Sequence, residues 1–270
     1  MTKRPLILVT NDDGIASPGL HAAAEAVAGL GDLLIAAPSS QQTGAGRSYR
    51  AQVDKTFHLT QIPLNGSQHP AYTADVSPAQ VVSLALLELA KERVDLCVSG
   101  INYGENIGSG VTISGTVGAA IEAGCSNIPA LAVSLETPQE FHRNHSDEID
   151  FSVAAHFTRH FARKVLARGL PDRVDLLKID VPASATPQTA WQMAKVSRQR
   201  YYLPVPGHRN YEEDADNFGY HIRVDEETLE PDSDIYVFAV DQQVSVVPIT
   251  IDLTAPVSLQ GVIDFLDGSS

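Results

Sequence analysis

Two adjacent carboxylates, Asp12 and Asp13, follow directly after the apolar run Leu6–Val9 near the start of the chain. Such a run, with β-branched members, is typical of a strand that is buried on both faces of a parallel sheet. Adjacent carboxylates at the end of a core strand repel each other and resist burial, and a bound cation offsets both costs. Open α/β sheets bind ligands beyond the carboxyl ends of their strands, which favours a cation site here. The alternative is a plain turn, because all residues of Asn11–Gly14 are common in turns.

A second polar segment, residues 99–110, follows another apolar run, Val94–Val98. It carries closely spaced glycines with Asn102 and Asn106 between them, and Ser114-Gly115-Thr116 then leads into a helical stretch. Backbone N–H groups at a glycine-bearing helix start form a site for anions. The segment is not a dinucleotide fingerprint, because no Gly-x-Gly-x-x-Gly follows the first strand. Together with the carboxylate pair, it indicates a site for phosphate and a metal.

The composition limits the classes of partner. The chain has 270 residues, with Lys+Arg 19 against Asp+Glu 33 and a formal net charge of -14. Duplex nucleic acid needs a basic face, so we expect no general binding to it, whereas a small phosphorylated substrate stays compatible. No stretch approaches the roughly 18 apolar residues of a membrane span, and Met1–Arg4 runs into the first strand without a signal-peptide region. Cys97 and Cys125 suggest no disulfide framework. We expect a cytoplasmic protein that does not bind membranes.

The first two thirds of the chain alternate between strand and helix patterns, as a doubly wound sheet requires. Helix starts are marked by Pro18 and by Ser77, a plausible cap. The expected strands are Leu6–Val9, Leu33–Ala37, Val94–Val98, Ala130–Ser134 and Val174–Val181, with a weaker candidate at Gln52–Leu59. The expected helices are His21–Leu30, Pro78–Arg93, Ala119–Gly124 and Ile149–Arg168.

The pattern changes after Val181. Residues Trp191–Leu203 alternate like one arm of a hairpin, and Asp225–Asp234 is acidic and expected to be solvated. Val244–Ile251 is a last apolar run, in which Pro248 favours an edge position or a bulge. We therefore predict a core of residues 1–181 and an extension of residues 182–270 that form one integrated domain.

The chain resembles the SurE (survival protein E) family of metal-dependent nucleotidases. The matching pieces occur in the family's order over nearly the whole chain: Asn11–Gly14, Pro18-Gly19, Ala37-Pro38, Thr43-Gly44, Ser99–Asn102, Gly104, Asn106, Ser114–Val117 and Val244–Thr254. The resemblance implies a Rossmann-like, doubly wound, mostly parallel α/β sheet with a C-terminal β-hairpin extension used in homodimer or homotetramer contacts. It also implies a divalent-metal phosphomonoesterase that hydrolyses nucleoside 5′-monophosphates, with 3′-monophosphates as a further substrate class.

The resemblance also implies roles for individual residues. Asp12, Asp13, Thr43 and Asn102 would be metal ligands, Asp12, Asp13 and Asn106 catalytic, and Asn11, Asn106, Ser114, Gly115 and Thr116 would bind phosphate. Such oxygen ligands select Mg²⁺ or Mn²⁺, here expected as one cation per subunit. Thr43 departs from the family, which usually has serine there, although either hydroxyl is able to coordinate a hard cation.

Three alternatives stay open at the level of sequence. The nucleophile is either a metal-bound water or one of the two aspartates. The family's usual charged and amide residues are replaced by Ser39–Gln42, so a non-catalytic nucleotide-binding or scaffold protein is the second hypothesis. A basic cluster of Lys195, Arg198, Arg200 and Arg209 either approaches a partner's metal site or pairs with Glu212–Asp214. Base preference is not predicted.

Overall fold

A computed structural model describes residues 3–142, 146, 148–205 and 219–268. Within these residues, one large sheet has the strand order β3-β4-β2-β1-β5-β6-β7-β11-β8, and β9 pairs with β10 in a separate antiparallel hairpin. The strands are β1 Leu6–Thr10, β2 Asp32–Pro38, β3 His58–Leu64, β4 Ser67–Ala74, β5 Leu96–Tyr103, β6 Ala130–Leu135, β7 Leu176–Val181, β8 Trp191–Met193, β9 Tyr202–Val205, β10 Gly219–Ile222 and β11 Val244–Ile249. The helices are α1 Pro18–Ala28, α2 Pro78–Leu84, α3 Gly115–Cys125, α4 Ser152–Arg168 and α5 Leu259–Leu266, with shorter turns η1 Ala85–Leu89, η2 Gly108–Ile113, η3 Gln139–Phe141 and η4 Tyr236–Val240.

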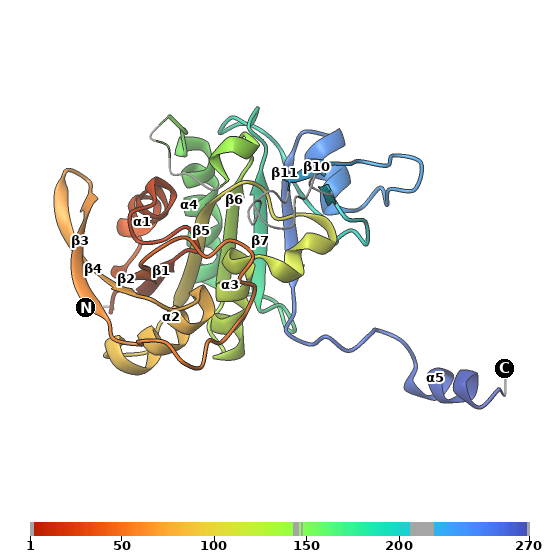
Figure 1. Ribbon diagram of the computed structural model, residues 1–270, viewed down its shortest axis with the longest axis horizontal. Helices are drawn as coiled ribbons and strands as arrows, with labels where there is room; N and C mark the ends of the chain where they lie inside the picture. Colours follow the sequence, from red (N-terminus) through yellow and green to blue (C-terminus); the bar gives the residue numbers. More distant parts are fainter. Residues whose placement is uncertain (1–2, 143–145, 147, 206–218, 269–270) are drawn as a thin grey trace, which may run out of the picture.

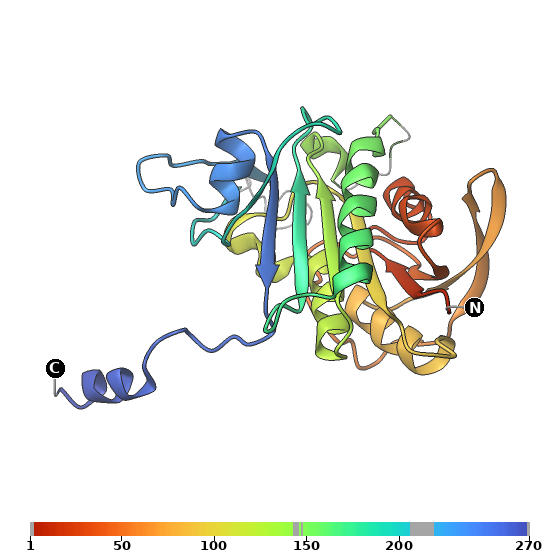
Figure 2. The same cartoon turned by 180° about the vertical axis from the view of Figure 1, so that it is seen from behind.

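The centre of the sheet is parallel, and helices cover both of its faces. Strands β2, β1, β5, β6 and β7 run in one direction. Successive residues of β1 face opposite layers: Ile7 and Val9 pack with α1 and α4, and Leu8 packs with α2 and α3. Helices α2 and α3 lie in front of the sheet in Figure 1, and α4 covers the other face in Figure 2. This confirms the predicted doubly wound, mostly parallel α/β fold with a hairpin in its C-terminal part.

Parallel pairing brings two predicted site segments to one edge of the sheet. Thr10, the last residue of β1, is in register with Ser99 of β5. Asp12 follows β1, and Asn102 lies near the end of β5, so both emerge at the carboxyl ends of neighbouring central strands. This is the edge at which open α/β sheets bind their ligands.

Two elements of the first half of the chain differ clearly from the sequence predictions. Only the end of Gln52–Leu59 is a strand, and β3 forms a hairpin with β4 around Asn65-Gly66, a two-residue turn with positive φ at both positions. The Pro78–Arg93 helix is shorter, because α2 ends at Leu84 and a single wide turn, η1, closes it. The Ser77 cap is confirmed: the Ser77 hydroxyl accepts from the backbone N–H of Gln80 at 3.2 Å.

The C-terminal third differs more. Of the predicted hairpin arm Trp191–Leu203, Trp191–Met193 is instead the edge strand β8, parallel to β11, whereas Tyr202-Leu203 begin β9 of the β9–β10 hairpin. Strand β11 lies between β7 and β8, but β8 pairs only with Val244–Val246, so within the described residues Pro248 is paired on the β7 side alone, which is the local edge environment that proline favours. Residues 182–270 thus add β11 and β8 to the sheet of the core, and the division at Val181 stays a prediction. Beyond β11 the chain leaves the sheet and ends in α5, which has no buried residue (Figure 1).

Candidate active site

The turn after β1 is held by its own asparagine. The Asn11 side chain donates to the Gly14 carbonyl at 3.0 Å and accepts from the Gly14 N–H at 3.1 Å. Asn11 is fully buried, so both of its polar atoms are used in closing this turn. The turn fixes Asp12 and Asp13 beyond the end of the strand, and contact of Asn11 with phosphate stays a prediction.

Asp12 lies against the start of α3. The Thr116 hydroxyl donates to Asp12 Oδ1, and a Cβ at Gly115 would lie 2.7 Å from Asp12 Cβ, so only glycine allows this approach. Burial raises the pKa of Asp12 to about 6, and the hydrogen bond from Thr116 opposes the rise. The helix start predicted to bind phosphate therefore also orients the first carboxylate.

Asp13 is held from two sides. Gln41 Nε2 donates to Asp13 Oδ1 at 3.0 Å, and the Tyr103 backbone N–H donates to Oδ2 at 3.3 Å. Burial, and after it the charge of Asp12, raise the pKa of Asp13 well above its usual range. Two neighbouring buried carboxyls are costly unless a proton or a cation compensates them. Their burial favours the predicted cation site over a plain surface turn.

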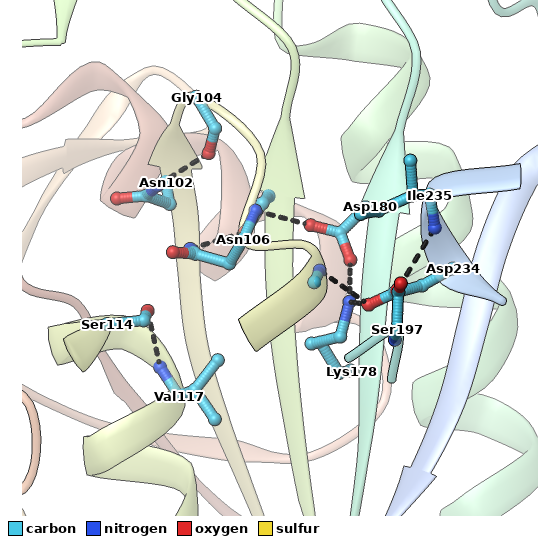
Figure 3. A network of polar contacts seen from close by, with 12 residues as sticks. Asn102, Gly104, Asn106, Ser114, Val117, Lys178, Asp180, Ser197, Asp234 and Ile235 are labelled. Carbon is cyan, nitrogen blue, oxygen red and sulfur yellow. Dashed lines mark hydrogen bonds and ion pairs between the residues drawn. The ribbon is translucent and has the colours of Figure 1, made fainter. Parts of the chain in front are cut away.

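Asn102 and Thr43 add neutral oxygen donors. The Asn102 side-chain nitrogen donates to the Gly104 carbonyl at 2.6 Å and to the Tyr103 carbonyl at 3.2 Å, which leaves the side-chain oxygen as an acceptor (Figure 3). Thr43 is exposed on the loop after β2. Both side chains line the same cavity as Asp12.

This cavity has a volume of about 430 Å³ and lies at the carboxyl edge of the sheet. The predicted site residues that line it are Asp12, Thr43, Asn102, Asn106 and Ser114. Asn11, Asp13, Gly115 and Thr116 lie outside its lining and support the first group from behind. A larger cavity of about 720 Å³ lies at the opposite edge, lined among others by Lys3, Arg93 and Asp175, and contains none of the predicted residues.

The donor set fits a hard cation. Among the described residues, no group of three or more His, Cys, Asp or Glu side chains is placed to hold a metal, so a nitrogen- or sulfur-rich centre is not formed there. The predicted ligands are two carboxylates, a hydroxyl and an amide oxygen, and oxygen donors of this kind suit Mg²⁺ or Mn²⁺. When ionised, the two buried carboxyl groups would supply the negative charge that such a cation needs.

Asn106 is anchored by a buried ionic network that the sequence analysis did not predict (Figure 3). Its backbone N–H donates to Asp180 Oδ1 at 2.7 Å, and its side-chain nitrogen donates to Ser134 Oγ at 2.9 Å. Asp180 pairs with Lys178, whose Nζ also lies 3.1 Å from Asp234 Oδ2. Burial acts first to lower the pKa of Lys178, but the two carboxylates raise it above its ordinary value, so the lysine stays charged.

Asp234 brings the C-terminal segment into this network. Its Oδ2 accepts from the Gly108 N–H at 3.1 Å, and its Oδ1 accepts from the Ser197 N–H at 2.9 Å. The prediction that Asp225–Asp234 is solvated is therefore wrong at Asp234, which is fully buried. One signal for the network was present in the sequence: Lys178 and Asp180 occupy alternate positions, and thus one face, of an otherwise apolar strand.

Aromatic residues close the far side of the cavity. His142 Nε2 lies 3.0 Å from the Thr137 carbonyl, so this nitrogen carries the proton and Nδ1 accepts from Tyr220 Oη at 2.5 Å. Burial lowers the pKa of His142, which keeps the ring neutral. A Cβ at Gly104 would lie 2.6 Å from His142 Nε2, so glycine allows the β5 loop to reach the ring. Tyr202 also lines the cavity.

The predicted basic cluster is dispersed in part. Arg200 lines the cavity of its own chain, whereas Lys195 pairs with Asp232 at the surface. Arg209 and its suggested partners Glu212–Asp214 lie outside the described residues. Of the described members of this cluster, Arg200 is the cation that lines the cavity.

Comparison with known proteins decides the family. Residues 7–203 match the sequence profile of the family described as "Survival protein SurE". The chain belongs to the SurE family. It is 38% identical over 260 residues to a protein of Thermococcus kodakarensis named "5'-nucleotidase SurE", which covers 95% of this chain and 96% of that protein. A protein of the same name from Thermococcus gammatolerans is 39% identical over 268 residues, covering 98% and 97%.

A solved structure carries the same fold. The crystal structure of the SurE protein from Aquifex aeolicus matches with a TM-score of 0.73 and 27% sequence identity, covering 97% of this chain and 100% of that chain. This supports the α/β architecture independently of the local motifs. None of the helices within the described residues is long and apolar enough to cross a bilayer.

Proposed function

We propose that this chain is a divalent-metal-dependent nucleotidase that hydrolyses nucleoside 5′-monophosphates to nucleoside and phosphate, with 3′-monophosphates as a further substrate class. The observation that carries the proposal is the pair Asp12 and Asp13, buried together beside a cavity that Thr43 and Asn102 also line. The relatives named 5'-nucleotidase SurE, which match nearly the full chain, support the nucleotide as substrate.

Asp12, Asp13, Thr43 and Asn102 would hold one Mg²⁺ or Mn²⁺ per subunit. When bound, the cation supplies Lewis acidity and positive charge beside the phosphoryl group. The chain's own residues would do the rest. The Ser114 hydroxyl and the backbone N–H groups at the start of α3 bind phosphate oxygens, helped by the positive end of the helix dipole. Asn106 would contribute its side-chain amide from the loop after β5.

The carboxylates would also control the attacking water. Thr116 fixes one oxygen of Asp12, and Gln41 with the Tyr103 N–H fixes those of Asp13, so neither carboxylate has to reorient when substrate binds. Such pre-organised acceptors orient a water for in-line attack on phosphorus. We propose water, rather than either aspartate, as the nucleophile.

The direct experiment is phosphate release from a panel of nucleoside 5′- and 3′-monophosphates, measured with Mn²⁺, with Mg²⁺ and with a chelator. We expect release that needs the cation. Tight nucleotide binding without any release would instead favour a non-catalytic nucleotide-binding or scaffold role, for which the changed loop Ser39–Gln42 would be the reason.

We also propose a cytoplasmic homodimer or homotetramer. The support is α5, whose apolar side chains Leu259, Phe265 and Leu266 are 68%, 73% and 75% exposed. A single amphipathic helix that projects from the core gains little unless it covers another surface. A second copy of the chain offers that surface with closed symmetry.

A further inference from the structure

Glu105 is a buried carboxyl in the wall of the cavity to which neither the family motifs nor the predicted ligand set gives a role. Its side chain is only 3% exposed, yet it lines the 430 Å³ cavity together with Asp12 and Asn106. Its Oε2 has no hydrogen-bond partner in the part of the chain that the structure describes. The Tyr202 hydroxyl is buried in the same cavity lining, and a hydrogen bond from it acts on the Glu105 carboxyl.

No cation of the described residues compensates Glu105. The ion pairs found among these residues do not include it, and the carboxyl groups whose charges act on it are Glu136 and Asp180. The phenol groups of Tyr201 and Tyr202 lie within hydrogen-bonding reach of this carboxyl. Burial raises the pKa of Glu105 to about 7, and a hydrogen bond with the Tyr202 hydroxyl opposes this rise. A buried carboxylate oxygen without a partner, as Glu105 Oε2 is among the described residues, costs free energy, and a ligand that donates a hydrogen bond to it would recover that cost.

The position of Glu105 suggests which part of a ligand makes those bonds. Glu105 precedes Asn106, so the two backbones are about 3.8 Å apart at Cα, and both side chains line one cavity. If Asn106 contacts the phosphate, the next group of a nucleotide within reach is the ribose. Ribose hydroxyls are donors, and a carboxylate accepts from two of them at once.

We propose that Glu105 and the Tyr202 hydroxyl form a ribose subsite, in which the Glu105 carboxylate accepts hydrogen bonds from the 2′- and 3′-hydroxyls of the nucleotide. This inference rests on the proposed nucleotidase function and deepens it, because it makes the enzyme selective for ribonucleotides over 2′-deoxyribonucleotides. A site built to bond a hydroxyl rejects the analogue that lacks it, since its own polar group is then left unpaired.

The test compares kcat/KM for AMP, 2′-deoxy-AMP, IMP and phenyl phosphate in the Mn²⁺-loaded wild type and in Glu105→Gln, Glu105→Ala and Tyr202→Phe. The wild type should prefer AMP to 2′-deoxy-AMP by roughly tenfold or more. Glu105→Ala should bring that ratio close to one, with a smaller loss on phenyl phosphate, which has no ribose. Glu105→Gln keeps an acceptor and should fall between. Tyr202→Phe should lower the ratio less than Glu105→Ala.

Glu136→Gln is the matched control, because it removes a carboxylate near Glu105 that does not line the cavity. It should leave the AMP to 2′-deoxy-AMP ratio unchanged. An equal ratio in the wild type and Glu105→Ala would overturn the subsite. So would a change confined to the AMP to IMP ratio, since this would assign Glu105 to the amino group of the base.

Calorimetry with adenosine and 2′-deoxyadenosine tests the subsite without turnover. It measures how tightly each nucleoside binds to the metal-free protein. Adenosine should bind more tightly to the wild type and lose that advantage in Glu105→Ala. Hydrolysis of phenyl phosphate without hydrolysis of any nucleotide would refute the nucleotidase function, while the calorimetry would still decide the fate of the subsite. Thermal melting of each variant confirms that it is folded.

Discussion

Lys178 Nζ lies 2.5 Å from Asp180 Oδ2, and both side chains are fully buried on one face of β7. The pair is connected to the candidate active site because Asp180 also accepts the Asn106 N–H at 2.7 Å. The third member, Asp234, comes from the C-terminal segment and accepts the Gly108 N–H at 3.1 Å. One buried lysine therefore fixes the loop that carries Asn106 and binds residues from both parts of the chain.

Removing this lysine should be costly. Lys178→Met leaves two buried carboxylates without a cation, and we expect a loss of about 3–5 kcal/mol in the free energy of unfolding. Asp180→Asn should cost less, since Lys178 keeps Asp234 as its partner. Urea unfolding measures both. Lys195→Met is the control, because its pair with Asp232 is exposed and such pairs contribute about 0–1 kcal/mol. Equal midpoints for Lys178→Met and the wild type would contradict the role of the network.

Thr43 is a predicted metal ligand at a position where the family usually has serine. If its hydroxyl coordinates the cation, Thr43→Ser should retain Mn²⁺ affinity and activity, whereas Thr43→Val should lose both although it keeps the shape of threonine. A packing role predicts the reverse order. Mn²⁺ titration by calorimetry, with phosphate release measured in parallel, separates the two, and full activity of the valine variant would remove Thr43 from the ligand set.

Glu105 makes the stability of the metal-free protein depend on pH. Its pKa is about 7 in the fold and 4.5 as the ordinary value, so between these values the folded state binds more protons than the unfolded state. Stability should therefore fall as pH rises from about 4.5 to 7, by up to about 3 kcal/mol from this group. Asp12 acts in the same direction up to about pH 6.

Glu105→Gln should remove the Glu105 part of this slope. Melting temperatures measured in chelator across this pH range test it, with the exposed Glu148→Gln as control. A stability that rises through this range in the wild type, or a slope that survives in Glu105→Gln, would show that the carboxyl is not held in an unfavourable environment.

The sequence predicted correctly those features that depend only on residues close together in the chain. The apolar run before Asp12 and the Ser77 cap both depend on neighbours within a few residues, and both are confirmed. The position of Trp191 as an edge strand depends on β11, more than fifty residues later, and no periodicity in either run specifies that pairing. The β3–β4 turn had a readable Asn65-Gly66 signal that the strand assignment missed.

The residues of the candidate site also fall into those that the sequence predicted and those that it did not. The carboxylate pair and Asn102 meet because parallel strands align their carboxyl ends, which follows from the fold class alone. Asp234 looked like part of a solvated acidic run, because its burial depends on a lysine in a distant strand. Nothing in the sequence marked Glu105, because only its burial in the wall of the cavity distinguishes it from an exposed loop glutamate.

The exposed tail should determine the assembly. Deleting residues 255–270 removes α5 with its exposed Leu259, Phe265 and Leu266 but leaves the sheet intact. We expect light scattering to show an oligomer with fewer subunits than the wild type. The far-UV spectrum should show that the core is still folded. An oligomer with the same number of subunits after the deletion would assign the contacts to another surface, such as the β9–β10 hairpin.

The central claim is that Asp12 and Asp13 hold the cation on which phosphate release depends. Asp12→Asn keeps the shape of the side chain and an acceptor for Thr116, so the fold should persist. The decisive measurement is Mn²⁺ binding by calorimetry together with AMP hydrolysis in the same preparation, with the exposed Asp54→Asn as control. We predict that Asp12→Asn loses most Mn²⁺ affinity and nearly all turnover while Asp54→Asn keeps both. Unchanged Mn²⁺ binding in a folded Asp12→Asn protein would contradict the account.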